Sequence, residues 1–146
     1  MTSDFPNNSP HPALGVDHGD ARIGIAATDE FGIMPHPVET VPTTGRDPLA
    51  RIAEIIAMRK IKTLVVGLPL RLDGSEGTAA IKVRKFAKLL SEAFPALPMV
   101  FVDETYTTAT ASEKLREAGR KAHQQKQIID QVAAVEILNL WMEGIS

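Results

Sequence analysis

The stretch "ALGVDHGDARIGIAATD", residues 13–29, decides how this chain begins its fold. Two short apolar runs flank "HGDA", whose Gly and Asp suit a tight turn, so the stretch predicts an antiparallel hairpin. Strand alternation places Ala13, Gly15 and Asp17 on one face of the first strand. Asp17 therefore follows very small neighbours, which would leave space beside its carboxylate. On spacing alone, Asp17 could equally be an acid that simply opens the turn.

Beyond this hairpin the sequence adds a third strand, ending near Val41, and then alternates between helix and strand. Asp47 and Pro48 are a good N-cap and first-turn pair for a helix over 48–60. The apolar runs 61–69 and 98–104 predict two strands, both buried. Three further helices are expected at about 75–93, from 107 or 110 to 119, and at about 126–143, with a polar connector at 120–125. The expected apolar face of the first of these consists of Ile81, Val83, Phe86, Leu89 and Leu90.

This order predicts an α/β fold in which an antiparallel meander continues into parallel strands. The result is a mixed five-stranded sheet with helices on both faces. A chain of 146 residues, 44% of them hydrophobic, has room for a single core. We expect one domain over 13–144, preceded by a flexible tail at 1–12.

Composition narrows the function classes. There is no cysteine, which excludes disulfides, thiolate metal sites and cysteine nucleophiles and fits a reducing compartment. No apolar run approaches the roughly 18 residues that cross a bilayer, so a cytoplasmic protein without a membrane partner is expected. A net charge of −2 argues against a uniformly basic nucleic-acid coat and leaves only local patches. The basic clusters are Arg59, Lys60 and Lys62; Lys82, Arg84, Lys85 and Lys88; and Arg120, Lys121 and Lys126.

Acids follow two strands and sit within the last helix. Asp103 and Glu104 are adjacent at a strand end, so they point to opposite faces and only one can join Asp17. Asp130 aligns with Ala133 and with the rest of the helix face expected to meet the sheet. A buried carboxylate needs a cation or hydrogen-bond donors. The alternatives are strand-end acids in solvent and, for Asp130, an acid favoured by the start of a helix.

Three carboxylates from two strand ends and one helix could converge on Mg²⁺ or Mn²⁺, which prefer oxygen ligands. Two such ions about 4 Å apart activate water and stabilise the leaving oxygen in phosphodiester hydrolysis. The pattern therefore favours metal-dependent cleavage of a phosphodiester.

Four ordered blocks carry a family resemblance. They are "LGVDHGDARIGIAATDEFGIMPHPVETV", "VVGLPLRLDGSEGTAAIKVRKFAKLL", "VDETYTTATASEKL" and "IIDQVAAVEILNLW", and they cover roughly residues 13–143. In order and spacing the chain resembles the YqgF (RuvX) family, described as pre-16S ribosomal RNA nucleases and as Holliday-junction-resolvase-like proteins. The resemblance implies an RNase H-like fold and a metal-dependent endonuclease acting on structured RNA, such as precursor 16S rRNA, or on branched DNA. Either a monomer or a homodimer is compatible with the sequence.

The resemblance also implies roles for single residues. Its motif positions make Asp17, Glu104 and Asp130 the catalytic, metal-binding acids, with Asp103 as an additional candidate. Arg22 matches an arginine of the first block, where it could orient Asp17 or contact a phosphate. The turn of the second block could receive phosphate at its backbone and at the next helix, or be no more than a well-capped turn. Its candidate residues are Ser75, expected to cap that helix, Lys82 and Arg84.

One position departs from the family pattern. The third block usually reads Asp-Glu-Arg, whereas Thr105 follows Glu104 here, which removes a phosphate donor unless Arg71, Arg84 or Arg120 replaces it. A nucleic-acid-binding factor without turnover is therefore an alternative. Asp17, Gly19 and the hairpin that contains them also resemble the phosphate-binding loop of the actin and sugar-kinase superfamily. However, 146 residues leave no room for the second lobe that closes over the nucleotide in those proteins.

Overall fold

The computed structural model describes residues 9–104 and 122–144, with side chains in the second range from Asp130 onward. Its five-stranded sheet has the order β3-β2-β1-β4-β5. Strands β1, β2 and β3 pair antiparallel, whereas β4 and β5 run parallel to β1. The predicted meander and mixed sheet are confirmed. The elements are β1 (Ala13–His18), β2 (Arg22–Ala27), β3 (His36–Pro42), α1 (Pro48–Arg59), β4 (Thr63–Leu68), α2 (Thr78–Ala93), β5 (Met99–Asp103) and α4 (Ala122–Gly144).

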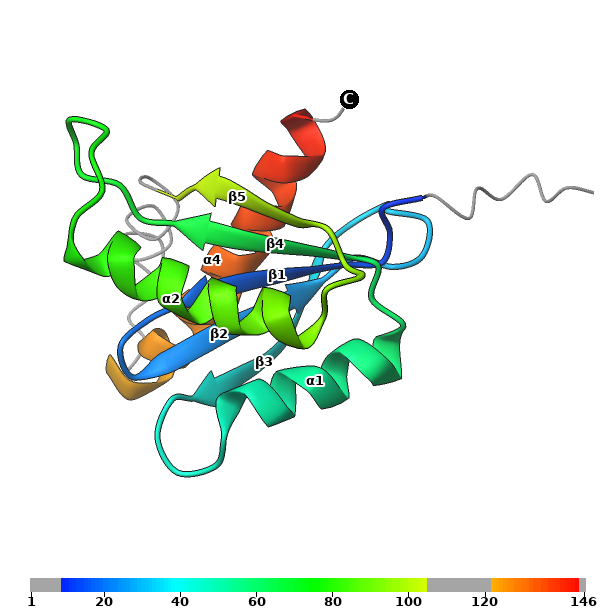
Figure 1. The fold of residues 1–146 in the computed structure, drawn as a ribbon, viewed down its shortest axis with the longest axis horizontal. Coiled ribbons are helices and arrows are strands. Elements are labelled where there is room, and N and C mark those ends of the chain that lie inside the picture. Colours follow the sequence, from blue (N-terminus) through cyan, green and yellow to red (C-terminus); the bar gives the residue numbers. More distant parts are fainter. Residues whose placement is uncertain (1–8, 105–121, 145–146) are drawn as a thin grey trace, which may run out of the picture.

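Helices cover both faces of the sheet, as the sequence predicts. Helices α1 and α2 lie on one face and α4 crosses the other (Figure 1). Alternation along β1 divides the core accordingly: Leu14 and Val16 pack with the α1 and α2 side, and Ala13 packs with α4. No helix among residues 9–104 and 122–144 has the length and apolarity to cross a membrane.

Helix α1 begins where its sequence signals predict. The Asp47 carboxylate accepts a hydrogen bond of 3.0 Å from the amide of Leu49, and Pro48 occupies the first turn. The helix ends at Lys60, whose left-handed backbone (φ 55°) turns the chain towards β4. This turn brings Arg59, Lys60 and Lys62 to the end of the sheet where β1 and β4 begin.

Helix α2 differs from the prediction in its start and in its buried face. It begins at Thr78 with Gly77 at the N-cap, so the predicted cap at Ser75 is wrong. Ser75 instead donates its hydroxyl to Asp73 across 2.6 Å, which keeps the preceding loop in a turn of its own. The face against the sheet is set by Ala80, Val83, Phe86, Ala87 and Leu90, while Ile81 and Leu89 are more than half exposed.

The structure also corrects the strand and helix ends farther along. Strand β5 lies at the edge of the sheet, and Val100 and Phe101 are each 36% exposed, so the prediction of a fully buried strand is wrong. Helix α4 starts at Ala122, so most of the expected connector at 120–125 is helical. The helix expected between 107 or 110 and 119, and Thr105, lie outside the described residues.

Glycines let α4 approach the sheet closely. A Cβ on Gly15 would lie 2.7 Å from Cγ of Leu138, and one on Gly24 would lie 2.0 Å from the carbonyl oxygen of Asp130. The small residues that precede Asp17 therefore accommodate α4, and the space that they leave is filled by the helix. This contact places Asp130 near the end of β1 and the start of β2.

Candidate active site

Two of the predicted acids meet at the carboxyl ends of the parallel strands. Asp17 lies near the end of β1 and is 9% exposed, and Glu104, directly after β5, is 6% exposed. The amide of Glu104 donates to the carbonyl of Leu68 across 3.2 Å, which holds the residue against the end of β4. Gly67 gives it room, because a Cβ there would lie 2.9 Å from the carboxyl carbon of Glu104.

A hydrogen bond joins the carboxyl groups of Asp17 and Glu104. Burial, and then the negative charge of Asp17, raise the pKa of Glu104 to about 10. Burial raises the pKa of Asp17 as well, while the hydrogen bond from Glu104 lowers it. Glu104 therefore carries the proton at neutral pH and donates it to Asp17. Asp103 is exposed, as expected for the neighbour that points to the other face.

Asp130 lies beside this pair but is held by Arg22. Nε of Arg22 donates to Oδ2 of Asp130 across 3.0 Å, in an ion pair whose side chains are 33% and 20% exposed. Burial raises the pKa of Asp130; the hydrogen bond from Arg22 opposes this rise, and the charge of Asp17 adds to it. Arg22 thus orients Asp130, whereas the sequence suggested that it could orient Asp17 or contact a phosphate.

The donor set fits a hard cation at Asp17 and Glu104. Two contacting, buried carboxyl groups offer only oxygen ligands, which a hard divalent cation prefers. The sequence predicts a third acid in this cluster. However, no three His, Cys, Asp or Glu side chains within 9–104 and 130–144 lie close enough together to hold a metal ion. Asp130 is instead paired with the Arg22 guanidinium.

The predicted phosphate-binding residues lie at the same edge of the sheet, and each has a polar partner. Lys82 on α2 pairs with Asp20 in the turn after Asp17, at 3.0 Å. Arg84 binds Glu76 through two hydrogen bonds of 2.6 and 2.7 Å and stacks 4.9 Å from the ring centre of Phe101. These ion pairs are exposed, so solvent screening leaves each with little effect on the stability of the fold. A phosphate could take the place of either carboxylate at little cost.

Sequence reasoning missed the glycine contacts that support these acids. Gly24 and Gly67 each lie inside a strand, where a glycine often marks close approach by another part of the chain. In "RIGIA" and "VVGLP" that signal was present. It does not reveal which element approaches, and here the elements are α4 and Glu104.

Glu104→Gln is expected to stabilise the metal-free protein, most strongly above neutral pH. Glu104 ionises near pH 4.5 in the unfolded chain but keeps its proton until a pH of about 10 in the folded protein. The stability contributed by the neutral side chain is therefore complete below pH 4.5 and is lost as the pH rises towards 10. Glutamine cannot ionise, so the variant escapes this loss.

Urea unfolding at pH 5 and pH 8 measures the effect. The variant should be more stable than the parent by on the order of 2 kcal/mol at pH 8, with little difference at pH 5. Equal stabilities at pH 8 would show that Glu104 is not held neutral beside Asp17.

Comparison with known proteins places the chain in a family. The family model described as "RuvX: Holliday junction resolvase" matches residues 11–144. The chain belongs to the RuvX family. A relative from Cutibacterium acnes, named "Putative pre-16S rRNA nuclease", is 46% identical over 132 residues, which cover 90% of this chain and 82% of that protein. A Streptomyces coelicolor protein of the same name is 48% identical over 134 residues, covering 90% and 79%.

Solved structures agree on the fold of this RuvX family member. T. thermophilus RuvC, solved in complex with a Holliday junction substrate, matches with a TM-score of 0.53 at 18% identity, covering 90% of this chain and 94% of that one. At this identity the likeness concerns the fold alone. It confirms the RNase H-like architecture that the four sequence blocks imply.

Proposed function

We propose that this protein is a divalent-metal-dependent endonuclease that cuts precursor 16S ribosomal RNA in the cytoplasm. The observation that carries the proposal is the buried contact of Asp17 with Glu104, at the edge of the sheet where β1, β4 and β5 end. The names of relatives at 46% and 48% identity support precursor rRNA as the substrate.

In the proposed mechanism, Asp17 and Glu104 would hold the ion, Mg²⁺ or Mn²⁺, through their carboxylate oxygens. When bound, such an ion supplies a more acidic water and positive charge beside the scissile phosphate. Glu104 must give up its proton to bind the ion. Burial disfavours the charged form of Glu104 and so raises its pKa. The charged form therefore needs a bound cation to stabilise it.

Arg22 and Asp130 are proposed to act together at this site. If the Arg22 guanidinium turned away from it, Asp130 would be placed to act as a further ligand of the ion or to accept a proton from water. The released guanidinium can then donate two hydrogen bonds to a phosphate. The half-buried position of the pair supports this role, because Arg22 is close to solvent while Asp130 lies against β2.

Ser75, Lys82 and Arg84 are proposed to bind substrate phosphates near the cut. All three are exposed, and they belong to the loop and helix that follow β4. Asp103, the additional candidate from the sequence, points to the other face and is exposed, so it is not among the ligands proposed for this ion.

A branched-DNA substrate is the second candidate, favoured by the description of the family model that matches residues 11–144. The two candidates separate in parallel assays with Mg²⁺ or Mn²⁺, using a precursor 16S rRNA mimic and a four-way DNA junction. We expect the RNA to be cut faster. Faster cutting of the junction would mean that branched DNA is the substrate. Binding of either substrate without cutting would mean that the protein is a nucleic-acid-binding factor without turnover.

A further inference from the structure

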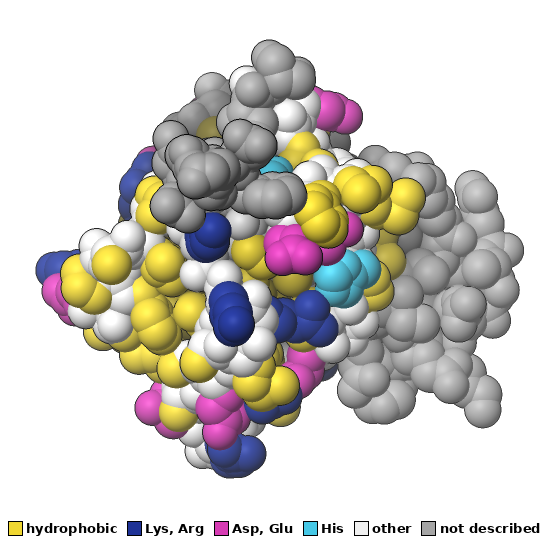
Figure 2. Space-filling view, turned by 90° about the vertical axis from the view of Figure 1, so that its right-hand side faces the viewer, with side chains coloured by type: hydrophobic (Ala, Val, Ile, Leu, Met, Phe, Trp, Pro, Cys, Tyr) yellow, Lys and Arg dark blue, Asp and Glu magenta, His cyan; other side chains and the backbone are white. Residues whose placement is uncertain are grey.

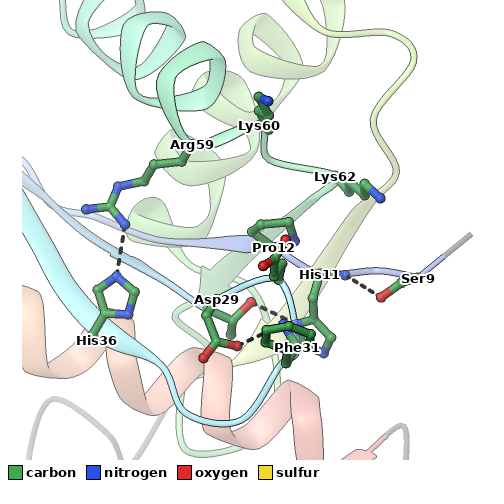
Figure 3. A pocket seen from close by; sticks show the side chains of 11 residues that line it. Ser9, His11, Pro12, Asp29, Phe31, His36, Arg59, Lys60 and Lys62 are labelled. Carbon is green, nitrogen blue, oxygen red and sulfur yellow. Dashed lines mark hydrogen bonds between the residues drawn. The ribbon is translucent and has the colours of Figure 1, made fainter. Parts of the chain in front are cut away.

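A pocket opens at the end of the sheet opposite to the candidate active site. It has a volume of about 860 Å³, within the range of small-molecule sites. Figure 2 views the molecule from this end, where basic side chains gather beside hydrophobic ones. The segment before β1, the loop between β2 and β3, and the turn between α1 and β4 build its walls (Figure 3). The length of β1 separates it from Asp17 by roughly 20 Å.

One wall carries the basic cluster Arg59, Lys60 and Lys62, which the proposed cleavage does not use. All three side chains are exposed, and none forms an ion pair with a carboxylate among the residues that the structure describes. Arg59 donates through Nη1 to Nε2 of His36 at 2.9 Å, which directs its guanidinium towards β3, while Lys60 and Lys62 extend in other directions (Figure 3). The wall therefore presents three positive charges without an internal counter-charge, as a phosphate site does.

The facing wall is the loop after β2, and its chemistry is different. The Asp29 carboxylate accepts hydrogen bonds of 3.0 and 3.2 Å from the amides of Phe31 and Ile33, which fix the loop. The Phe31 ring is 64% exposed and available for stacking. Asp29 and Glu30 add acceptors that repel a second phosphate but suit amino or hydroxyl groups. A ligand that fits both walls has an anionic end and an aromatic, hydrogen-bonding end.

We propose that this pocket binds a nucleotide, with its phosphate at Arg59, Lys60 and Lys62 and its base on Phe31. Stacking of a base on an aromatic side chain favours binding, and it tolerates any base because every base has a flat π-face. The nucleotide can be a free mononucleotide or an unpaired residue of an RNA strand, since both offer the same phosphate and base. The inference does not depend on the proposed nuclease activity, because binding here needs neither metal nor cleavage.

The chain contains its own reporter of this pocket. Trp141 is the single tryptophan, and its ring meets the His11 ring edge-on at 5.3 Å between centroids. His11 lines the pocket, so ligand binding there should change the tryptophan fluorescence. Substitution of the acids at the other end of β1 should leave the tryptophan fluorescence unchanged.

The test is calorimetry and tryptophan fluorescence on the full chain without divalent metal. The probes are 5′-AMP, adenosine, inorganic phosphate and a short unpaired RNA. We expect 5′-AMP or the RNA to bind and to shift the fluorescence, and adenosine and phosphate to bind at least tenfold more weakly. Binding of both 5′-AMP and RNA means that a free nucleotide suffices. Binding of the RNA alone means that the ligand is an unpaired residue of an RNA strand.

Two variants locate the binding and one controls for charge. Lys62→Glu should weaken binding at least tenfold and Phe31→Ala at least fivefold, whereas Lys88→Glu, exposed on α2, should leave it unchanged. Circular dichroism checks that each variant is folded, and Arg59→Glu replaces Lys62→Glu if the latter is not. The proposal is overturned if neither 5′-AMP nor RNA binds at millimolar concentration, or if binding survives both the charge reversal and Phe31→Ala. The proposed nuclease activity would stand in either case.

Discussion

Asp17→Asn is expected to reduce cleavage of the precursor RNA mimic by about 10³-fold or more. Asparagine has the shape of aspartate but lacks its charge, so the Asp17 and Glu104 pair loses the ligand that holds a cation. The fold should survive, because the substitution also removes the like charge that raises the pKa of Glu104. The loss should therefore appear in the cleavage rate and not in the melting temperature.

Single-turnover cleavage with Mg²⁺, and separately with Mn²⁺, measures this effect. Glu92→Gln is the control, since it removes one negative charge from an exposed position on α2. It should cut within about threefold of the parent. If Asp17→Asn cuts as fast as the parent, the acids at this edge do not form the reaction site.

Gly24→Ala is expected to destabilise the fold by about 3 kcal/mol or more, the upper range for forcing an extra methyl group into a packed interior. The new Cβ would lie 2.0 Å from the carbonyl oxygen and 2.4 Å from the carbonyl carbon of Asp130. Both atoms are backbone, so α4 itself must move away from β2. That movement also carries Asp130 away from Asp17, and cleavage should fall together with stability.

Urea unfolding checks the change, with Gly144→Ala as a matched control. Gly144 ends α4, and a Cβ there meets no atom within 4 Å, so its replacement should change stability by less than about 0.5 kcal/mol. A cost below about 1 kcal/mol for Gly24→Ala would mean that α4 does not rest on β2 as closely as the structure places it.

Much of the fold could be predicted from local pattern. Turn residues separate the strands of the meander, Asp47 starts α1, and the spacing of Asp130 from Ala133 places both on the helix face that meets the sheet. Each of these features depends on neighbours in the sequence. The start of α2 did not follow from such a pattern, because Ser75 satisfies Asp73 within the loop and leaves the cap to Gly77.

The site could be predicted only in part, because its contacts join segments far apart in the chain. The sequence marks Asp17, Glu104 and Asp130 as acids in unusual places, and the structure brings the first two together. No local signal shows that Arg22 reaches Asp130, 108 residues away, or that Gly67 makes room for Glu104. These pairings depend on strand register and on the path of α4.

Calorimetric titration with Mn²⁺ at pH 8 tests the central claim most directly. The protein should bind the ion, and Asp17→Asn and Glu104→Gln should each weaken binding at least tenfold, while Glu92→Gln binds as the parent does. Unchanged Mn²⁺ affinity in both site variants would contradict a cation site formed by these two carboxylates.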